Sequence, residues 1–194
     1  MFINWALQEI NLKIVYYGPG LSGKTTNLLY IHNKLDPAER SDLITLKTRE
    51  DRTLFFDFMQ LEFGKIKNKR PKFNLYTIPG QSFYAESRKI ILNGVDGIVF
   101  VADSQRARIL NNLESLYDLE KNLAEYGKDL NDFPWIIQYN KRDLSDIEPI
   151  ETLQSKLNAY QVPYFEAVAF QGKGVFITLK TIISQVIAYI QNKI

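Results

Sequence analysis

Apolar residues along this chain follow two alternating patterns. Short apolar or alternating runs typical of strands cover residues 10–17, 54–61, 73–78, 97–103, 134–139 and 162–168. Apolar residues at three-to-four spacing, typical of helices, mark residues 26–31, 110–123 and 175–190. Because strands and helices alternate, the pattern predicts an α/β fold, a doubly wound and mostly parallel sheet with helices on both faces. Phe2 to Trp5 is a candidate for an extra N-terminal edge strand.

Length and composition exclude several classes of protein. The 194 residues predict one domain, 1–194, without a linker or a repeat. A formal charge of +2 is too small to indicate a nucleic-acid partner, and the absence of cysteine excludes disulfides and thiol chemistry. The N-terminus lacks a leader pattern, no run could span a bilayer, and Phe2 excludes N-myristoylation. We therefore expect a cytoplasmic protein with no transmembrane segment and no lipid anchor.

The sequence GPGLSGKT, from Gly18 to Thr25, matches the pattern of a phosphate-binding loop. It lies between a predicted strand and a predicted helix, which is the context that such a loop requires. The alternative is an ordinary glycine-proline turn, but lysine and threonine both stand in their places. We expect the backbone to surround the phosphates, Lys24 to reach the β- and γ-phosphates, and the Thr25 hydroxyl to ligate Mg²⁺. The predicted contacts are Gly18, Gly20, Leu21, Ser22, Gly23, Lys24, Thr25 and Thr26.

A second motif indicates which nucleotide binds. Asn140, Lys141 and Asp143 form an N-K-x-D sequence directly after the apolar run of residues 134–139. Asp143 can accept from the ring N–H and the amine of guanine, whereas adenine offers neither donor and would leave the carboxylate unpaired. The alternative is a polar loop, but together with the phosphate loop the motif favours GTP over ATP. We expect backbone N–H groups of Ala167, Val168 and Ala169 to meet guanine O6.

Two loops are placed where they could sense the γ-phosphate. In the first, Thr53 is expected to ligate Mg²⁺, and Arg52 beside it could neutralise charge on the phosphoryl group, although the spacing alone favours a solvated arginine. In the second, Gly80 can offer its amide to the γ-phosphate and Gln81 can orient water. Thr77 stands where such loops usually have aspartate. It could hold a Mg²⁺-bound water but adds no charge, so we expect weaker Mg²⁺ binding.

Long stretches of the chain resemble the bacterial Ras-like small GTPases of the mutual gliding-motility A (MglA) family. They are KIVYYGPGLSGKTTNL from Lys13, DRTLFFDF from Asp51, LYTIPGQ from Leu75, SRKIILNGVDGIVFVADSQ from Ser87 and QYNKRDL from Gln138. The threonine at position 77 is itself a mark of that family. The resemblance implies that Arg52 is an intrinsic arginine finger, that Thr53 is the Mg²⁺-binding switch threonine and that Gln81 orients water.

The resemblance also implies a function and partners. It implies a GTP/GDP switch that slowly hydrolyses GTP and regulates polarity and motility through effectors at a cell pole. It implies an activating partner of the roadblock/LC7 class, similar to MglB, and a chain that is monomeric when alone. The alternative is a nucleotide-dependent scaffold with negligible turnover, which Thr77 would permit, whereas Arg52 together with Gln81 favours hydrolysis.

Overall fold

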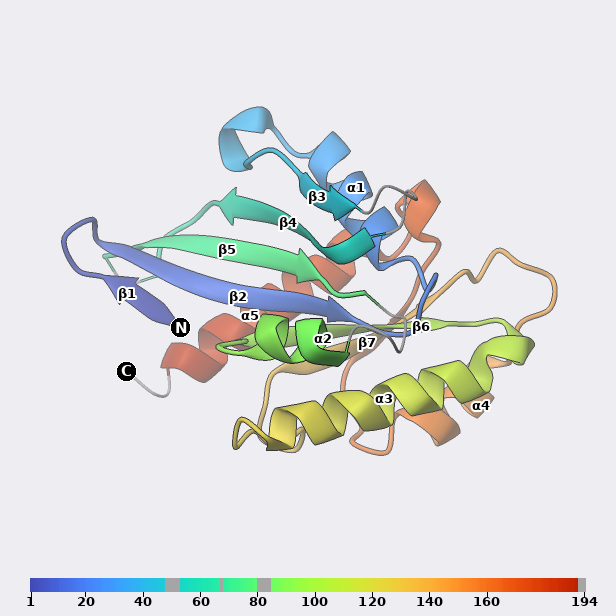
Figure 1. Ribbon diagram of the computed structural model, residues 1–194. Helices are drawn as coiled ribbons and strands as arrows, with labels where there is room; N and C mark the ends of the chain where they lie inside the picture. Colours follow the sequence, from blue (N-terminus) through green and yellow to red (C-terminus); the bar gives the residue numbers. More distant parts are fainter. Residues whose placement is uncertain (48–52, 67, 80–84, 192–194) are drawn as a thin grey trace.

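A mixed sheet of eight strands forms the centre of the computed structural model, which describes residues 1–47, 53–66, 68–79 and 85–191 (Figure 1). The strand order is β3-β4-β5-β2-β6-β7-β8, and β1 pairs separately with β2. The strands are β1 (Phe2–Asn4), β2 (Glu9–Tyr17), β3 (Ile44–Lys47), β4 (Thr53–Glu62), β5 (Arg70–Thr77), β6 (Gly97–Asp103), β7 (Trp135–Asn140) and β8 (Tyr164–Glu166). From β5 to β8 neighbouring strands are parallel, whereas β3, β4 and β1 pair antiparallel.

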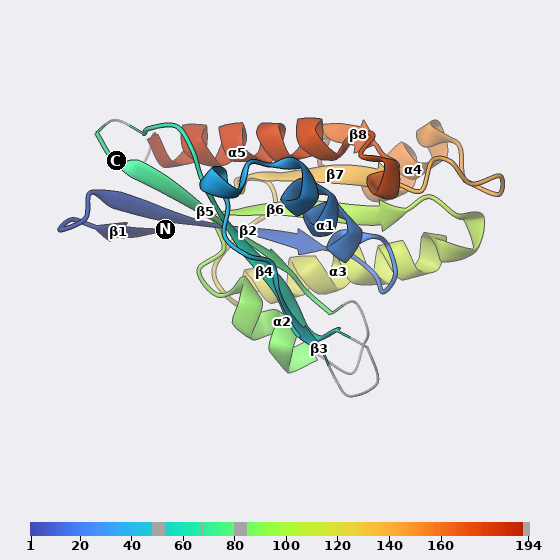
Figure 2. The ribbon, with the colours of Figure 1, turned by 90° about the horizontal axis from the view of Figure 1, so that it is seen from above.

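Helices cover both faces of the sheet (Figure 2). One face packs against α1 (Lys24–Lys34) and α5 (Val175–Gln191), and the other packs against α2 (Ala85–Leu92), α3 (Ile109–Ala124) and α4 (Ile150–Leu157). Within the described ranges, three short 3₁₀ turns complete the elements: η1 (Pro37–Glu39), η3 (Arg106–Arg108) and η4 (Ala169–Gln171). The doubly wound α/β fold predicted from the sequence is confirmed.

The central strand β2 shows why two cores form. Ile14 and Tyr16 belong to the core on the α1 and α5 face, whereas Val15 and Tyr17 belong to the core on the opposite face. Successive side chains of a strand point to opposite faces, so a strand covered by helices on both faces must be apolar throughout. The β6 strand, which is buried at all seven positions, follows the same rule.

The sequence predictions missed three elements, although the extra N-terminal strand is confirmed as β1. The missed elements are β3, α2 and α4, which have only four, eight and eight residues. Elements this short hold too few apolar residues to establish a period. The strand predicted for residues 73–78 begins earlier, at Arg70, because Arg70 pairs with Glu9 of β2.

The topology gathers the predicted motifs at one edge of the sheet. The parallel strands β2, β5, β6 and β7 all point the same way, so the segments that follow Tyr17, Thr77, Asp103 and Asn140 leave from the same edge. Open α/β sheets bind ligands at this carboxyl edge. Among the described helices, none is both long enough and apolar enough to cross a bilayer.

Candidate nucleotide-binding site

The phosphate loop connects β2 to α1, as predicted. Gly18, Leu21 and Gly23 have φ of 141°, 66° and 100°, values that fold the loop tightly before α1 begins at Lys24. A Cβ on Gly18 would lie 2.3 Å from the Val101 carbonyl oxygen, so the loop lies directly on β6 and admits only glycine there. The loop therefore ends at the N-terminus of α1, where unpaired N–H groups and the helix dipole favour an anion.

Lys24 lies inside this loop and has no acidic partner within hydrogen-bond distance in the described part of the chain. Its Nζ donates to the carbonyl oxygens of Gly18, at 2.9 Å, and Pro19, at 2.7 Å. Burial lowers the pKa of Lys24 to about 7, an effect that nearby Asp57 opposes. A polyphosphate in the loop would supply the missing negative charge, so the residues present fit that group.

A cavity of about 340 Å³ lies beside the loop, where the base of a nucleotide would be expected. It is bounded by the phosphate loop with the start of α1, by the segment after β7 and by η4. The lining residues are Leu21, Gly23, Thr26, Asn140, Lys141, Asp143, Leu144, Ala169 and Phe170. Three sequence segments that were assigned separately to phosphate, guanine and O6 recognition therefore meet around one space.

Asn140 joins these segments. Its Nδ2 donates to the Ser22 carbonyl oxygen at 2.8 Å, and its Oδ1 accepts from the Ala169 N–H at 2.9 Å. A Cβ on Gly23 would lie 2.1 Å from that Nδ2. The side chain of Asn140 thus holds the phosphate loop and the segment after β8 at a fixed separation.

The backbone N–H groups predicted to meet guanine O6 already have partners. Ala167 donates to the Tyr139 carbonyl, Val168 to the Lys173 carbonyl and Ala169 to Asn140 Oδ1. Of the three residues, only Ala169 lines the cavity. Contact with O6 would require the Ala169 N–H to share or exchange its bond.

Asp143 and Lys141 also line the cavity. Asp143 is exposed, and its carboxylate has no hydrogen-bond or ion-pair partner among the described residues, so both oxygens can accept from a ligand. Lys141 has a φ of 65°, and its Nζ donates to Asp103 Oδ2 at 2.7 Å. That contact fixes the lysine stem along the cavity wall.

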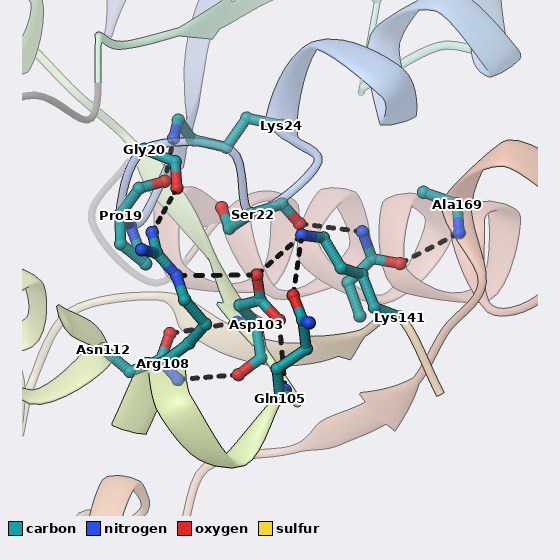
Figure 3. A network of polar contacts seen from close by, with 11 residues as sticks. Pro19, Gly20, Ser22, Lys24, Asp103, Gln105, Arg108, Asn112, Lys141 and Ala169 are labelled. Carbon is teal, nitrogen blue, oxygen red and sulfur yellow. Dashed lines mark hydrogen bonds and ion pairs between the residues drawn. The ribbon is translucent and has the colours of Figure 1, made fainter. Parts of the chain in front are cut away.

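A buried carboxylate organises the neighbouring polar network (Figure 3). Asp103, at the end of β6, is fully buried and accepts from Lys141. Arg108 stands on its other side, with Nε 3.9 Å from Asp103 Oδ2, and donates through Nη2 to the Gly20 carbonyl at 2.7 Å. The network therefore links the guanine motif to the phosphate loop.

A second buried carboxylate lies at the opposite end of the phosphate loop. Asp57 of β4 is fully buried, and its Oδ2 accepts from the Thr25 hydroxyl at 2.6 Å and from the Thr77 hydroxyl at 2.7 Å. Its Oδ1 has no partner among the described residues. No group of three acidic, histidine or cysteine side chains gathers anywhere in the described ranges. The hydroxyl and carboxylate oxygens gathered here are of the kind that Mg²⁺ accepts as ligands, so the residues present could hold it.

Four predicted residues bear on the γ-phosphate, and three of them, Arg52, Gly80 and Gln81, lie outside the described residues. The fourth, Thr53, is the first residue of β4 and pairs with Lys47 of β3. β4 thus begins at the predicted switch threonine, and Asp57 lies four residues further along the same strand.

Comparison with known proteins agrees with this geometry. Residues 13–188 match the model of the Ras family. The chain belongs to the Ras family. It is also 54% identical over 191 residues to "Mutual gliding-motility protein MglA" of Myxococcus xanthus (strain DK1622), a match that covers 98% of each chain.

Ras-family membership makes the chain a small GTPase, an enzyme that hydrolyses GTP to GDP and phosphate. Ras-family GTPases in general bind GTP or GDP together with Mg²⁺. A Mg²⁺-bound nucleotide fits three features: the buried Lys24, the glycine-only approach at Gly18, and Oδ1 of Asp57, which has no partner among the described residues. The family assignment and the geometry thus point to the same edge of the sheet.

Sequence reasoning missed several residues that belong to this Ras-family site. Leu144 and Phe170 line the cavity with apolar surface, and Arg108 holds Gly20. Asp57 was the easiest of the missed residues to find from the sequence. It interrupts an apolar run, and because side chains alternate along a strand it lies on the same face as the buried Met59 and Leu61. A carboxylate on the buried side of a strand requires a partner, and that alone could have identified it.

Proposed function

We propose that this Ras-family GTPase is a slow molecular switch of the MglA type, which regulates cell polarity and motility by binding effectors at a cell pole in its GTP state. The observation that supports this most is the likeness to a gliding-motility protein over 98% of both chains. The switch would be recruited from the cytoplasm to the pole by its partners.

The proposed nucleotide contacts divide between three parts of the site. Gly18, Gly20, Leu21, Ser22, Gly23 and Thr26 would surround the phosphates with Lys24 supplying positive charge, since that lysine lies buried at the helix N-terminus. Asp143 would accept from the guanine ring N–H and amine, with Asn140 and Lys141 holding the pocket's shape. Ala167, Val168 and Ala169 would border O6.

The proposed catalytic residues are Arg52 and Gln81. Gln81 would orient the water that attacks the γ-phosphorus, with GDP leaving through its β-phosphate oxygen, and Gly80 would offer its N–H to the γ-phosphate. Arg52 would neutralise the charge that develops on the phosphoryl oxygens. Thr25 and Thr53 would ligate Mg²⁺, which would offset the negative charge of the phosphates, and Thr77 would act through a water.

The proposed activating partner is a roadblock/LC7 protein similar to MglB. Because Arg52 would already supply a guanidinium within the chain, such a partner has only to push Arg52 and Gln81 into place, and it need not donate an arginine. The support for this is the family likeness together with the presence of both residues in one sequence.

Single-turnover GTP hydrolysis, with and without a roadblock partner, tests the proposal. We expect slow hydrolysis alone and a large acceleration with the partner at saturation. Tight GTP binding with negligible turnover in both conditions would instead identify a nucleotide-dependent scaffold.

A further inference from the structure

Two hairpin tips lie together at the amino end of the parallel strands, opposite the nucleotide site, as Figure 1 and Figure 2 show. One is the turn between β1 and β2, and the other is the connection between β4 and β5. They touch twice: Lys69 Nζ lies 4.4 Å from the centroid of the Trp5 ring, and Arg70 N donates to the Gln8 carbonyl oxygen at 2.8 Å. The two tips therefore form one surface, which we call the tip surface. Its members are Trp5, Leu7, Phe63, Lys65, Lys69 and Arg70.

Three apolar side chains of the tip surface are open to solvent. Trp5 is 65% exposed, Leu7 54% and Phe63 36%. Phe63 is held in place because it stacks on Phe73 of β5, with 5.2 Å between the ring centroids. A single exposed apolar side chain is ordinary, whereas several that gather on two adjoining tips mark a surface that meets another molecule.

The tip surface also carries unbalanced positive charge. Lys65 is exposed, and neither Lys65 nor Lys69 forms an ion pair with any carboxylate among the described residues. Two carboxylates lie at this end of the sheet, but Lys72 already pairs with both of them, at 3.2 Å from Glu9 and 3.2 Å from Glu62. The charge of the tip surface is therefore complementary to an anionic partner.

The contact between Lys69 and Trp5 indicates what kind of anionic partner fits. An ammonium group over an indole ring keeps the cation and the apolar ring in the same place. Indole rings are favoured at the boundary between lipid headgroups and acyl chains, and a lysine there keeps its stem on apolar surface and its charge in the polar layer. An anionic bilayer takes both groups at once, whereas attraction to an acidic protein surface by charge would need the lysines alone.

We propose that the tip surface is a docking site for anionic phospholipid bilayers: Trp5 and Leu7 enter the headgroup region, and Lys65 and Lys69 approach the lipid phosphates. The inference goes beyond the proposed function, because it assigns a surface that shares no residue with the nucleotide site. The nucleotide site lies at the other end of the parallel strands, so a docked chain presents that site away from the bilayer. With so few contacting groups the binding is weak and reversible.

Flotation of the full chain with lipid vesicles tests the proposal. One set of vesicles holds equal parts of phosphatidylglycerol and phosphatidylcholine, and the other holds phosphatidylcholine alone. We expect the chain to float with the anionic vesicles only. The bound fraction should fall as salt is raised, because added ions screen the charges. Failure to bind the anionic vesicles, or equal binding to both sets, would overturn the proposal.

Tryptophan fluorescence shows whether the tip itself enters the lipid. The chain has two tryptophans, and Trp135 is buried in the core, so a change in emission on adding vesicles reports on Trp5. We expect emission to shift to shorter wavelength with the anionic vesicles, because the indole leaves water. Vesicle binding without that shift would identify a purely electrostatic contact, of the kind that an acidic protein would also make, and would contradict the assignment to a bilayer.

Substitutions separate the apolar and the charged contributions. Trp5→Ser, and the double variant Lys65→Gln with Lys69→Gln, should each weaken vesicle affinity by about fivefold to thirtyfold. The lysine variant keeps the test decisive if Trp5→Ser disturbs the turn, because it leaves the apolar side chains of both tips in place. Parent-like affinity in the lysine variant would overturn the proposal.

Matched controls remove the same groups elsewhere on the molecule. Tyr117→Ser removes an aromatic ring of α3 that is 70% exposed. Lys34→Gln with Lys156→Gln removes two exposed lysines from α1 and α4, which lie on opposite faces of the sheet. Both controls should bind vesicles as the parent does. Equal weakening by the two pairs of lysine substitutions would mean that the net charge of the chain attracts the vesicles, and the tip surface would lose its role.

Discussion

Gly23 lies directly against Asn140, 117 residues later in the chain. The space that a Cβ on Gly23 would need is occupied by Asn140 Nδ2, only 2.1 Å away, and Gly23 has a φ of 100°. Because Asn140 is bonded to both Ser22 and Ala169, it cannot move aside without releasing one of the two segments around the cavity. The phosphate loop and the guanine motif thus depend on each other's shape.

This contact predicts that Gly23→Ala lowers nucleotide affinity by at least about tenfold, or about 1.4 kcal/mol. Gly64→Ala is the control, because Gly64 also has a positive φ, of 74°, but nothing lies within 4 Å of its Cβ position. Both variants should lose about 1–2 kcal/mol of stability through backbone strain. Only Gly23→Ala should bind GDP more weakly in a fluorescence titration, and equal binding by the two variants would contradict the contact.

A second prediction concerns the choice of base. Asp143→Asn should lower guanine nucleotide affinity by about 2–4 kcal/mol, because it loses a charge-assisted pair and one accepting oxygen. Affinity for the xanthine nucleotide should rise, because its carbonyl replaces the guanine amine. Asp143 is exposed and unpaired among the described residues, so the thermal midpoint should stay near that of the parent. Asp146→Asn, an exposed control in the same loop, should bind GTP normally.

The source of catalytic charge can be tested at Arg52. Arg52→Ala should leave GTP binding nearly intact and reduce partner-stimulated hydrolysis by about 10³-fold or more, because an arginine finger acts mainly in the transition state. Gln81→Ala should have a similar effect. Arg49→Ala is the control, since Arg49 lies only three residues before Arg52 in the sequence, and it should resemble the parent. The measurement is GTP turnover with the roadblock partner at saturation. A full response by Arg52→Ala would mean that the charge comes from the partner.

A buried pair beneath the phosphate loop predicts an effect on stability. Asn27 Nδ2 donates to Gln138 Oε1 at 2.8 Å, and Gln138 Nε2 donates to Asn27 Oδ1 at 3.0 Å, with both residues fully buried. Gln138→Leu should lower the free energy of unfolding by about 1–3 kcal/mol, because Asn27 Oδ1 loses its donor. Urea unfolding measures this. Adding Asn27→Leu should cost less than a second independent loss, and strict additivity would contradict the pairing.

Much of the fold and site could be predicted from local patterns. The apolar runs at residues 10–17 and 97–103 became β2 and β6, and the loop from Gly18 to Thr25 lies between strand and helix as expected. These features depend on neighbouring residues, whose periodicity and turn chemistry the chain carries locally. The N-K-x-D motif borders the cavity for the same reason, since it begins at Asn140, the last residue of β7.

The expectation about Thr77 shows where local reading ends. The sequence predicted that the segment around Thr77 supplies no charged ligand for Mg²⁺. That holds for β5, the strand that ends at Thr77, when it is considered without its neighbours. Whether a charge is nearby depends on the register between β4 and β5, which brings Asp57 beside Thr77. Strand register is determined by the packing of whole faces, so no motif around either residue records the pairing.

The sequence by itself determined that a glycine-rich anion site and a guanine-type motif follow two strands of an α/β fold, because each is a run of consecutive residues with its own backbone chemistry. Only the tertiary structure decided which side chains support them. Asn140 against Gly23, Arg108 on Gly20 and Asp57 between Thr25 and Thr77 are contacts between distant parts of the chain. Such contacts arise from the order and register of strands, and those follow from burying both faces of one sheet at once.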